Sequence, residues 1–206
     1  MSLEDRPVVT DPAELRDQPE QWPVTATHDI HRDDWIVALR EDTLHRPGHP
    51  DEPFDRLVIE HPGAVMALAI DDDERVCCLR QYRHVAGRRF VELPAGLCDA
   101  AGEDPLEAAK RELREEAELE ASDWRHLVSV YPSVGILAEK HHLYLARGLS
   151  PVSRGDFAME HEEADIEVFW TPMADLLDAV LDGRVQQSPL AVAVLTYDAL
   201  RRRGRL

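Results

Sequence analysis

A cluster of acidic residues in one short segment limits what this chain can fold into more than any other feature. The segment Arg111-Glu112-Leu113-Arg114-Glu115-Glu116 places three carboxylates within about one and a half helical turns. Residues four apart share a helix face, so Glu112 and Glu116 would repel each other by roughly a few tenths of a kcal/mol. A divalent cation would offset that repulsion. Oxygen ligands this close together suit Mg²⁺ or Mn²⁺, which keep several waters and share their remaining positions with a substrate phosphate.

The apolar residues around this cluster predict a helix with one buried face. They recur at helical spacing and should point inward: Leu106, Ala109, Leu113 and Ala117. Glu112 and Glu116 then fall at the flank of the buried stripe, while Arg111 and Glu107 fall on the far side. A solvated helix face with several ion pairs is the simpler interpretation of such a segment. The flank position favours the metal site, because carboxylates there can face a cleft while the helix stays anchored.

Together with residues upstream, this segment resembles the signature of the Nudix hydrolases. That signature is a Gly, five residues, a Glu, seven residues, and then Arg-Glu-aliphatic-x-Glu-Glu-x-Gly-aliphatic. The matching residues are Glu103, Arg111, Glu112, Leu113, Glu115, Glu116 and Leu119. Two residues depart from it, since Gly96 stands one position early and Glu118 replaces the closing glycine. The second departure predicts that the helix ends without a left-handed glycine cap.

Other stretches resemble the ADP-ribose pyrophosphatase branch of this family. They cover roughly residues 59–169 and read Glu60-His61-Pro62-Gly63-Ala64-Val65, Gln81-Tyr82-Arg83, Glu92-Leu93-Pro94-Ala95-Gly96 and His161-Glu162-Glu163-Ala164-Asp165. The resemblance implies an α/β fold, a Nudix-type α/β/α sandwich with a mixed sheet. It also implies a Mg²⁺-dependent enzyme, with Mn²⁺ as a substitute, that hydrolyses ADP-ribose to AMP and ribose 5-phosphate.

The same resemblance implies a set of metal ligands. Glu112 and Glu116 are the expected direct ligands, and Glu115 is a third ligand or a catalytic neighbour that orients the others. The backbone carbonyl of Ala95 is expected to complete the shell of one ion. Gly96 beside it has no side chain, which lets the main chain approach the site closely.

A general base is expected downstream of the signature. Residues 133–139 resemble the mobile loop of this branch, which ends in a glutamate that activates the attacking water, here Glu139. Val134 replaces a proline of that loop and Leu137 replaces a small polar residue. Glu139 as an exposed residue without a catalytic role remains an alternative. The rival bases are His141, His142, Glu162 and Glu163, and at most one of the adjacent histidines can point inward from a strand.

The remaining site residues are assigned to structure or to substrate. Glu103 and Arg111 are expected to form an ion pair that holds the loop against the helix. Arg83 ends a strand and is a candidate clamp for a substrate phosphate, because its planar fork matches phosphate oxygens. The adenine is expected to stack on a residue of the N-terminal region, and the candidates are Trp22, Trp35 and Arg56.

Length and charge limit the organisation and the partners. A chain of 206 residues fits one compact domain with a small appendage. We divide it into an N-terminal leader with a β-hairpin subdomain, 1–58, and a Nudix hydrolase domain, 59–206. The resemblance implies that the leader serves dimerisation and substrate contact in a homodimer. A net charge of −18 argues against nucleic acid or a membrane surface as a partner. The resemblance implies a small nucleoside diphosphate as the substrate.

The cysteines and the absence of long apolar runs indicate the compartment. The three cysteines form neither a disulfide framework nor a zinc spacing. Cys77 and Cys78 are adjacent in a strand pattern, so they should face opposite sides as small hydrophobic residues. No apolar run approaches 18 residues and the first residues are no signal peptide. The expectation is a soluble, cytoplasmic protein.

Alternating and periodic patterns predict the other elements. The predicted strands are 35–39, 56–60, 64–70, 75–81, 124–131, 141–147 and 164–170, and the predicted helices are 175–181 and 190–201. The first two strands would form an N-terminal hairpin. The next two would form a second hairpin around the acidic turn 71–74, which is a solvated turn rather than a metal site.

Two other functions remain open. The first is an enzyme with the same chemistry and a different substrate. Another nucleotide sugar, a dinucleotide or an oxidised nucleoside phosphate would use the same carboxylates. The other function is a sensor that binds ADP-ribose without hydrolysing it. Such a sensor would usually lack metal carboxylates and carry an added DNA-binding segment, whereas this chain retains the carboxylates and is strongly acidic.

Overall fold

The structure is a computed structural model that describes residues 9–159 and 161–206, apart from the side chain of Glu162. The strands are β1 (Val24–His31), β2 (Ala38–Leu44), β3 (Phe54–Glu60), β4 (Ala64–Ala69), β5 (Arg75–Arg83), β6 (Arg88–Glu92), β7 (Ala95–Leu97), β8 (Leu119–Val130), β9 (His141–Pro151) and β10 (Glu167–Pro172). The helices are α1 (Pro105–Ala117), α2 (Met173–Leu181) and α3 (Ser188–Arg202), with short 3-10 turns η2 (Pro12–Glu14), η3 (His84–Ala86) and η4 (His161–Asp165).

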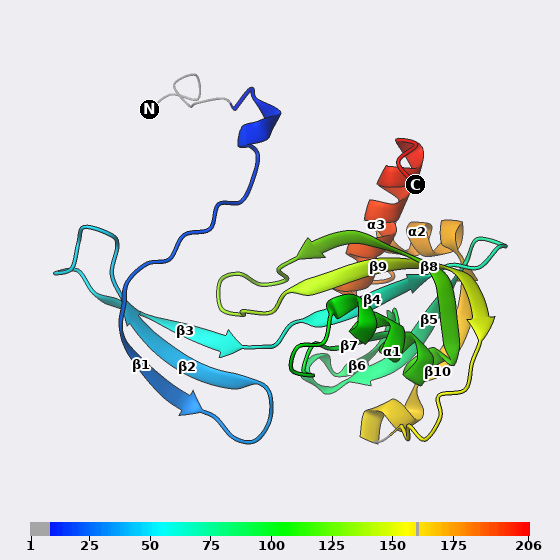
Figure 1. Cartoon of the computed structure of the whole chain (residues 1–206), viewed down its shortest axis with the longest axis horizontal. Helices are drawn as coiled ribbons and strands as arrows, with labels where there is room; N and C mark the ends of the chain where they lie inside the picture. Colours follow the sequence, from blue (N-terminus) through cyan, green and yellow to red (C-terminus); the bar gives the residue numbers. More distant parts are fainter. Residues whose placement is uncertain (1–8, 160) are drawn as a thin grey trace.

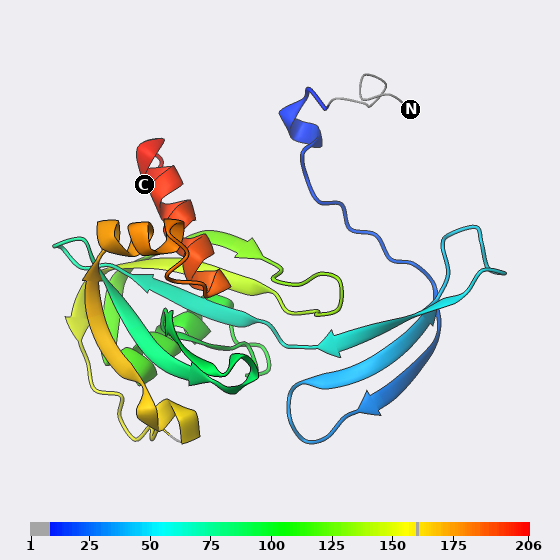
Figure 2. The same cartoon turned by 180° about the vertical axis from the view of Figure 1, so that it is seen from behind.

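The N-terminal region forms an antiparallel sheet in the order β1-β2-β3. This sheet stands to one side of the rest of the molecule, and residues 9–23 extend away from both (Figures 1 and 2). The pairing of β2 with β3 confirms the expected antiparallel hairpin. The prediction missed β1, and it began the first strand too early. Residues 33–35 form a turn in which Asp33 accepts a hydrogen bond from the backbone N–H of Trp35 at 2.8 Å.

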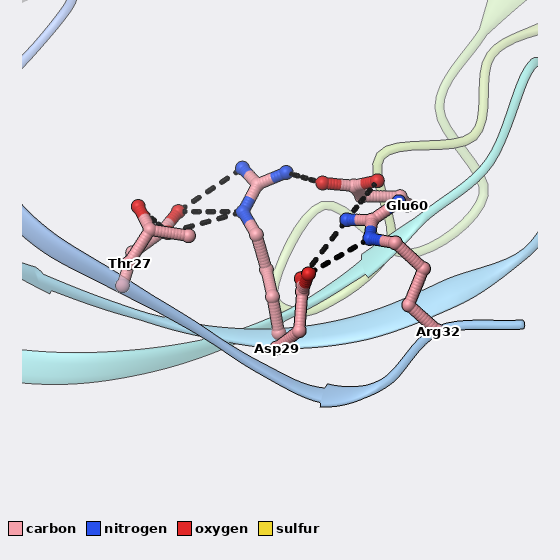
Figure 3. Close-up of polar contacts among 6 residues, drawn as sticks. Thr27, Asp29, Arg32 and Glu60 are labelled. Carbon is pink, nitrogen blue, oxygen red and sulfur yellow. Dashed lines mark hydrogen bonds and ion pairs between the residues drawn. The ribbon is translucent and has the colours of Figure 1, made fainter.

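A network of charged side chains ties the three N-terminal strands together (Figure 3). Arg40 on β2 pairs through two nitrogens with Asp42, which is buried, and also with Glu60 at the end of β3. Arg32 reaches Glu60 from the other side at 2.8 Å and pairs with Asp29 at 2.9 Å. Two arginines therefore hold Glu60, the last residue of the strand that leads into the main body (residues 61–206).

The main body contains two sheets. One has the order β7-β4-β9-β8 and the other has the order β10-β5-β6. The first sheet is mixed, because β4 and β9 run parallel while the other neighbours run antiparallel. The predicted hairpin of residues 64–70 and 75–81 is wrong. After the turn, β4 and β5 diverge into different sheets and share one bridge between Ile70 and Val76.

Helices cover both faces of the sheets, which confirms the expected α/β/α sandwich (Figure 1). Alternate residues of β4 separate the two cores, since Met66 packs among residues of α2 and α3 whereas Val65 packs against α1. Adjacent cysteines behave in the same way. Cys78 lies in the core with α2 and α3, and Cys77 lies in the core beneath α1, both fully buried as predicted.

Local signals in the sequence set the two ends of α1. Asp104 caps its first turn by accepting the N–H of Leu106 at 2.8 Å, and Pro105 occupies the first helical position. Glu118 ends the helix in the left-handed conformation, with φ of 54°, and its N–H bonds back to Arg114. The prediction that the left-handed cap is lost is therefore wrong, because Glu118 adopts the conformation in place of glycine.

The C-terminal helices confirm the predicted ranges within a few residues. Both pack on β4, β5 and β9, where Met173, Leu176, Leu190 and Val194 are buried. The predicted last strand begins later than expected because η4 occupies residues 161–165. Within the described part of the chain, no helix has both the length and the apolar character needed to cross a membrane.

Candidate active site

Helix α1 brings the acidic cluster to the edge of the mixed sheet. Its buried face carries Ala108, Ala109 and Leu113, so the helix lies flat on β4 and β7. Glu116 continues this face and is only 6% exposed, while Glu112 and Glu115 lie at its margin. The structure thus places these carboxylates where the sequence predicted them, between a packed core and the surface.

Strand β7 meets two of these glutamates at its first residues. The backbone N–H of Ala95 donates to Glu116 Oε2 at 2.8 Å. A side chain on Gly96 would collide with Glu112, since its Cβ would lie 2.7 Å from Cγ of Glu112 and closer still to the carboxylate. Gly96 therefore allows the close approach that the sequence predicted, and its early position in the signature leaves the contact intact.

Arg111 holds the remaining carboxylates of the cluster. Its guanidinium lies 3.4 Å from Glu103, which is the ion pair that the sequence predicted. It also lies 2.6 Å from Glu112 Oε1 and 3.1 Å from Glu115 Oε2. One cation thus offsets the repulsion among three carboxylates.

Burial perturbs the protonation of the two most enclosed glutamates. It raises the pKa of Glu112 to about 7, and the negative charges of Glu115 and Glu163 add to the shift while Arg111 opposes it. Burial also raises the pKa of Glu116 well above its usual range, despite the N–H of Ala95, and Glu112 and Glu163 add to it. A cation bound beside them would favour their ionised forms.

The donors present fit a hard divalent cation. Carboxylate oxygens with raised pKa values, next to a strand edge, are the ligand type that Mg²⁺ or Mn²⁺ takes. In the described ranges, however, no three acidic, histidine or cysteine side chains already enclose a metal position. Two of the candidate ligands, Glu112 and Glu115, are turned to Arg111 instead. Metal binding would transfer them from the guanidinium to the cation.

Arg83 and Glu163 add charge around this cluster. Arg83 ends β5 and pairs with the buried Glu92 through two nitrogens, at 2.6 and 3.0 Å. Its positive charge also acts on Glu116. The sequence offered Glu163 as an alternative base, and the structure places its charge within reach of Glu112 and Glu116. The side chain of Glu162, the other alternative, lies outside the described residues.

Glu139 lies in the loop between β8 and β9, beside two histidines. Its Oε1 is 3.0 Å from Nε2 of His141 and 3.6 Å from Nε2 of His61. His141 is buried, whereas His142 turns to Ser129 at 3.0 Å, which agrees with the expectation that at most one points inward. The sequence analysis did not predict that His61 lies beside Glu139. The Pro62-Gly63 pair after it is typical of a turn, which was the one local signal at this position.

The N-terminal candidates for adenine binding stay within their own sheet. Trp35 lies in the β1–β2 turn and is 69% exposed. Arg56, on β3, has its guanidinium 4.5 Å from the centre of the Phe54 ring, and Trp22 packs edge-on against that ring. In one chain this sheet lies apart from α1 (Figure 1). These residues are therefore not brought to the acidic cluster of their own chain.

Comparison with known proteins identifies the family. Residues 60–191 match the model of the NUDIX domain. An ADP-ribose pyrophosphatase of Mycobacterium tuberculosis (strain ATCC 25618 / H37Rv) is 44% identical over 165 residues, which are 80% of this chain and 78% of the relative. An ADP-ribose pyrophosphatase of Bacillus subtilis (strain 168) is 33% identical over 139 residues, or 68% of this chain and 74% of the relative.

A solved structure shows the same fold. A crystal structure of an ADP compounds hydrolase superposes with a TM-score of 0.73 at 22% identity, covering 93% of this chain and 100% of the other. This chain belongs to the Nudix hydrolase family, as the family match and the relatives show.

Proposed function

We propose that this enzyme hydrolyses the pyrophosphate bond of ADP-ribose, giving AMP and ribose 5-phosphate, with Mg²⁺ as cofactor and Mn²⁺ as a substitute. The observation that carries the proposal is the enclosed pair Glu112 and Glu116, two carboxyl groups on one face of α1 that both meet the first residues of β7. The choice of substrate is supported by the relative that is 44% identical and named for ADP-ribose.

In this proposal Glu112 and Glu116 hold the metal directly, Glu115 is the third ligand, and the carbonyl of Ala95 completes a shell. The bound cation supplies charge that neutralises the pyrophosphate oxygens. If Glu112 and Glu115 were to hold the cation, Arg111 would keep its ion pair with Glu103, which holds the loop against α1. Arg83 adds a positive charge at the end of β5, where its exposed portion would clamp a phosphate.

The general base in this proposal is Glu139. It removes one proton from a water molecule while the water oxygen forms a new bond to phosphorus. The bond between that phosphorus and the bridging oxygen breaks, and its electron pair stays on the leaving phosphate. The two products, AMP and ribose 5-phosphate, contain the atoms of ADP-ribose and one water. Glu139 suits this role because its carboxylate lies in the loop before β9, where His141 and His61 hold it in place.

The N-terminal sheet serves dimerisation and adenine binding in this proposal. All eight residues of β1 are exposed, and apolar side chains on the sheet meet solvent in a single chain, among them Val24, Ile30, Trp35, Ile36 and Leu57. A second copy of the chain would cover this surface. Residues 1–58 would then form a subdomain that brings Trp35 or Arg56 to the partner's site, while residues 59–206 form the hydrolase domain.

The remaining features fit a cytoplasmic enzyme with a small-molecule substrate. Cys77, Cys78 and Cys98 are all free, as in a reducing compartment. The net charge of −18 disfavours nucleic acid and membrane surfaces. The ADP-ribose sensor is the weaker alternative, because every carboxylate that a sensor would lose is present on α1.

A substrate panel tests the proposal. Purified protein with Mg²⁺ or Mn²⁺ is given ADP-ribose, a nucleotide sugar and a diadenosine polyphosphate separately, and products are separated by ion exchange. AMP and ribose 5-phosphate from ADP-ribose, at a higher kcat/KM than for the other substrates, support the proposal. Equal turnover across the panel favours a broader pyrophosphohydrolase. Binding of ADP-ribose without any product would favour the sensor. Light scattering measures the mass and tests the homodimer.

A further inference from the structure

The connection between the N-terminal sheet and the main body runs beside the loop that carries Glu139. The backbone N–H of Ile59 donates to the carbonyl of Ile136 at 2.8 Å, and the N–H of Ala138 donates to the carbonyl of Ile59 at 3.0 Å. Further along, the N–H of Ala64 donates to the carbonyl of Lys140 at 2.9 Å. These bonds continue the parallel pairing of β4 with β9.

Gly63 keeps the two segments in close contact. It has φ of +96°, and a Cβ built there would lie 2.9 Å from the carbonyl oxygen of Lys140, the residue after Glu139. A residue with a side chain would therefore be strained and would push the connection away from the loop. Glu139 and His61 consequently face each other across two segments joined by backbone hydrogen bonds.

The hydrogen bond from Gly63 also decides which nitrogen of His61 faces Glu139. The backbone N–H of Gly63 donates to His61 Nδ1 at 3.2 Å, so Nδ1 carries no proton in the neutral ring. The proton is then on Nε2, the nitrogen that lies 3.6 Å from Glu139 Oε1. This distance exceeds that of a direct hydrogen bond. The contact is thus an attraction between a polar N–H and a carboxylate.

His141 approaches the same oxygen from β9. Its Nε2 lies 3.0 Å from Glu139 Oε1, and because a carboxylate can only accept, Nε2 carries the proton. His141 is 5% exposed, and its Nδ1 is buried without a hydrogen-bond partner among the described residues.

These two histidines offset the burial of Glu139. Burial raises the pKa of Glu139, but the hydrogen bond from His141 and the electrostatic attraction to His141 and His61 outweigh it and leave the pKa lowered. Burial lowers the pKa of His61, with Glu139 opposing and His141 adding to it. His61, from the connection, and His141, from β9, are the groups that act on Glu139. The neighbouring Lys140 extends over the ring of Tyr131.

We propose that His61 is a positioning residue that, together with His141, holds Glu139 ionised and in place, and so joins the N-terminal sheet to the general base. Glu60, the residue before His61, connects this position to the N-terminal sheet, because it forms ion pairs with Arg40 and Arg32 of that region (Figure 3). The inference rests on the proposed function in that it takes Glu139 as the base.

Two substitutions at one position separate positioning from a merely structural role. In His61→Gln, the side-chain amide nitrogen can replace Nε2 and still face Glu139. In His61→Asn, the amide is too short to do so but its oxygen can still accept the N–H of Gly63. We therefore expect His61→Asn to lower kcat about tenfold below neutral pH with KM within about twofold, and His61→Gln to recover most of that loss. His126→Gln, a surface histidine on β8, is the matched control.

The second measurement does not depend on turnover. NMR of protein labelled with ¹³C at the glutamate carboxyls follows the titration of Glu139, whose signal is assigned by its loss in Glu139→Gln. His61→Asn and His141→Asn should each move this titration upward by about half a pH unit or more, and move the acid limb of the kcat profile with it. His61→Gln should leave both near those of the parent.

The outcomes separate this inference from the proposed function. An unchanged Glu139 titration in His61→Asn overturns the inference, whatever the enzyme hydrolyses. The reverse order, with His61→Gln slow and His61→Asn normal, overturns it as well. That result would mean that only the hydrogen bond from the N–H of Gly63 to residue 61 matters for activity. A parent protein that leaves ADP-ribose intact, or a Glu139→Gln variant with full activity, refutes the proposed function instead, and the titration then still decides whether His61 holds Glu139.

Discussion

Replacing Gly96 by alanine should damage the site without damaging the fold. The added Cβ would lie 2.7 Å from Cγ of Glu112, whereas ordinary contact begins at 3.4 Å. Cγ must therefore move by about 0.7 Å, and the carboxylate beyond it must move farther. Only the far end of one side chain has to yield, and the φ of Gly96 is open to alanine. The fold should thus lose about 1 kcal/mol or less, since restricting the unfolded chain contributes in the opposite direction.

Activity should fall much more than stability. A misplacement of about 1 Å at a catalytic group can lower a rate by about 10²-fold, which corresponds to roughly 2.7 kcal/mol of barrier. We expect Gly96→Ala to lose about that factor in kcat for ADP-ribose and to bind Mn²⁺ more weakly. The midpoint of thermal unfolding, Tm, should stay within about 3 °C of the parent. Calorimetry measures Tm, titration measures Mn²⁺ affinity, and AMP release measures the rate.

A double-mutant cycle provides the control. In Glu112→Ala the side chain that collides with the new Cβ is gone, so adding Gly96→Ala should change Mn²⁺ affinity by less than about twofold. A similar loss of affinity from Gly96→Ala in both backgrounds would refute the reasoning, because the effect would then come from the backbone of β7. Full activity in the single variant would refute it as well.

Three further predictions concern α1. Because burial raises the pKa of Glu112 from 4.5 to about 7, the metal-free fold should lose up to about 3 kcal/mol as the pH rises between these values. Urea unfolding at about pH 5 and pH 7.5 measures the free energy of unfolding, and in Glu112→Gln its decrease between these pH values should be mostly absent. An equal decrease in the parent and the variant would contradict this prediction. In Glu116→Gln the side chain still accepts the N–H of Ala95, so Tm should stay within about 3 °C of the parent, while turnover should vanish because a metal ligand is lost. AMP release above a tenth of the parent rate would argue against a ligand role. Asp104→Ala removes the helix cap, and calorimetry should show about 1 kcal/mol less stability with KM unchanged; an unchanged Tm would mean that the cap contributes nothing.

The part of the site carried by α1 could be predicted because local rules determine it. The spacing of Ala109 and Leu113 fixed which face is buried, and that phase placed Glu112 and Glu116 at the margin. The Glu103–Arg111 pair and the glycine at position 96 were expected from the family resemblance. The structure bears out these arrangements. The roles of the residues in catalysis stay predictions.

Long-range contacts explain most of what the sequence missed. The separation of β4 and β5 into two sheets depends on β7, β9, β6 and β10, and nothing in residues 64–81 reports those partners. Strand β1 is exposed along its length, so it has no alternation of buried and exposed residues for a pattern to detect. The left-handed conformation of Glu118 was missed for another reason. Residues other than glycine adopt this conformation only rarely, so the sequence gives no local signal for it.

The bonds at Ile59 have a practical consequence for anyone who shortens this protein. The family match begins at residue 60, and a chain trimmed to that limit would look complete by homology. It would nevertheless lack the amide and the carbonyl that meet Ile136 and Ala138. The smallest fragment worth expressing therefore starts before β3, one strand upstream of the limit that the family match sets.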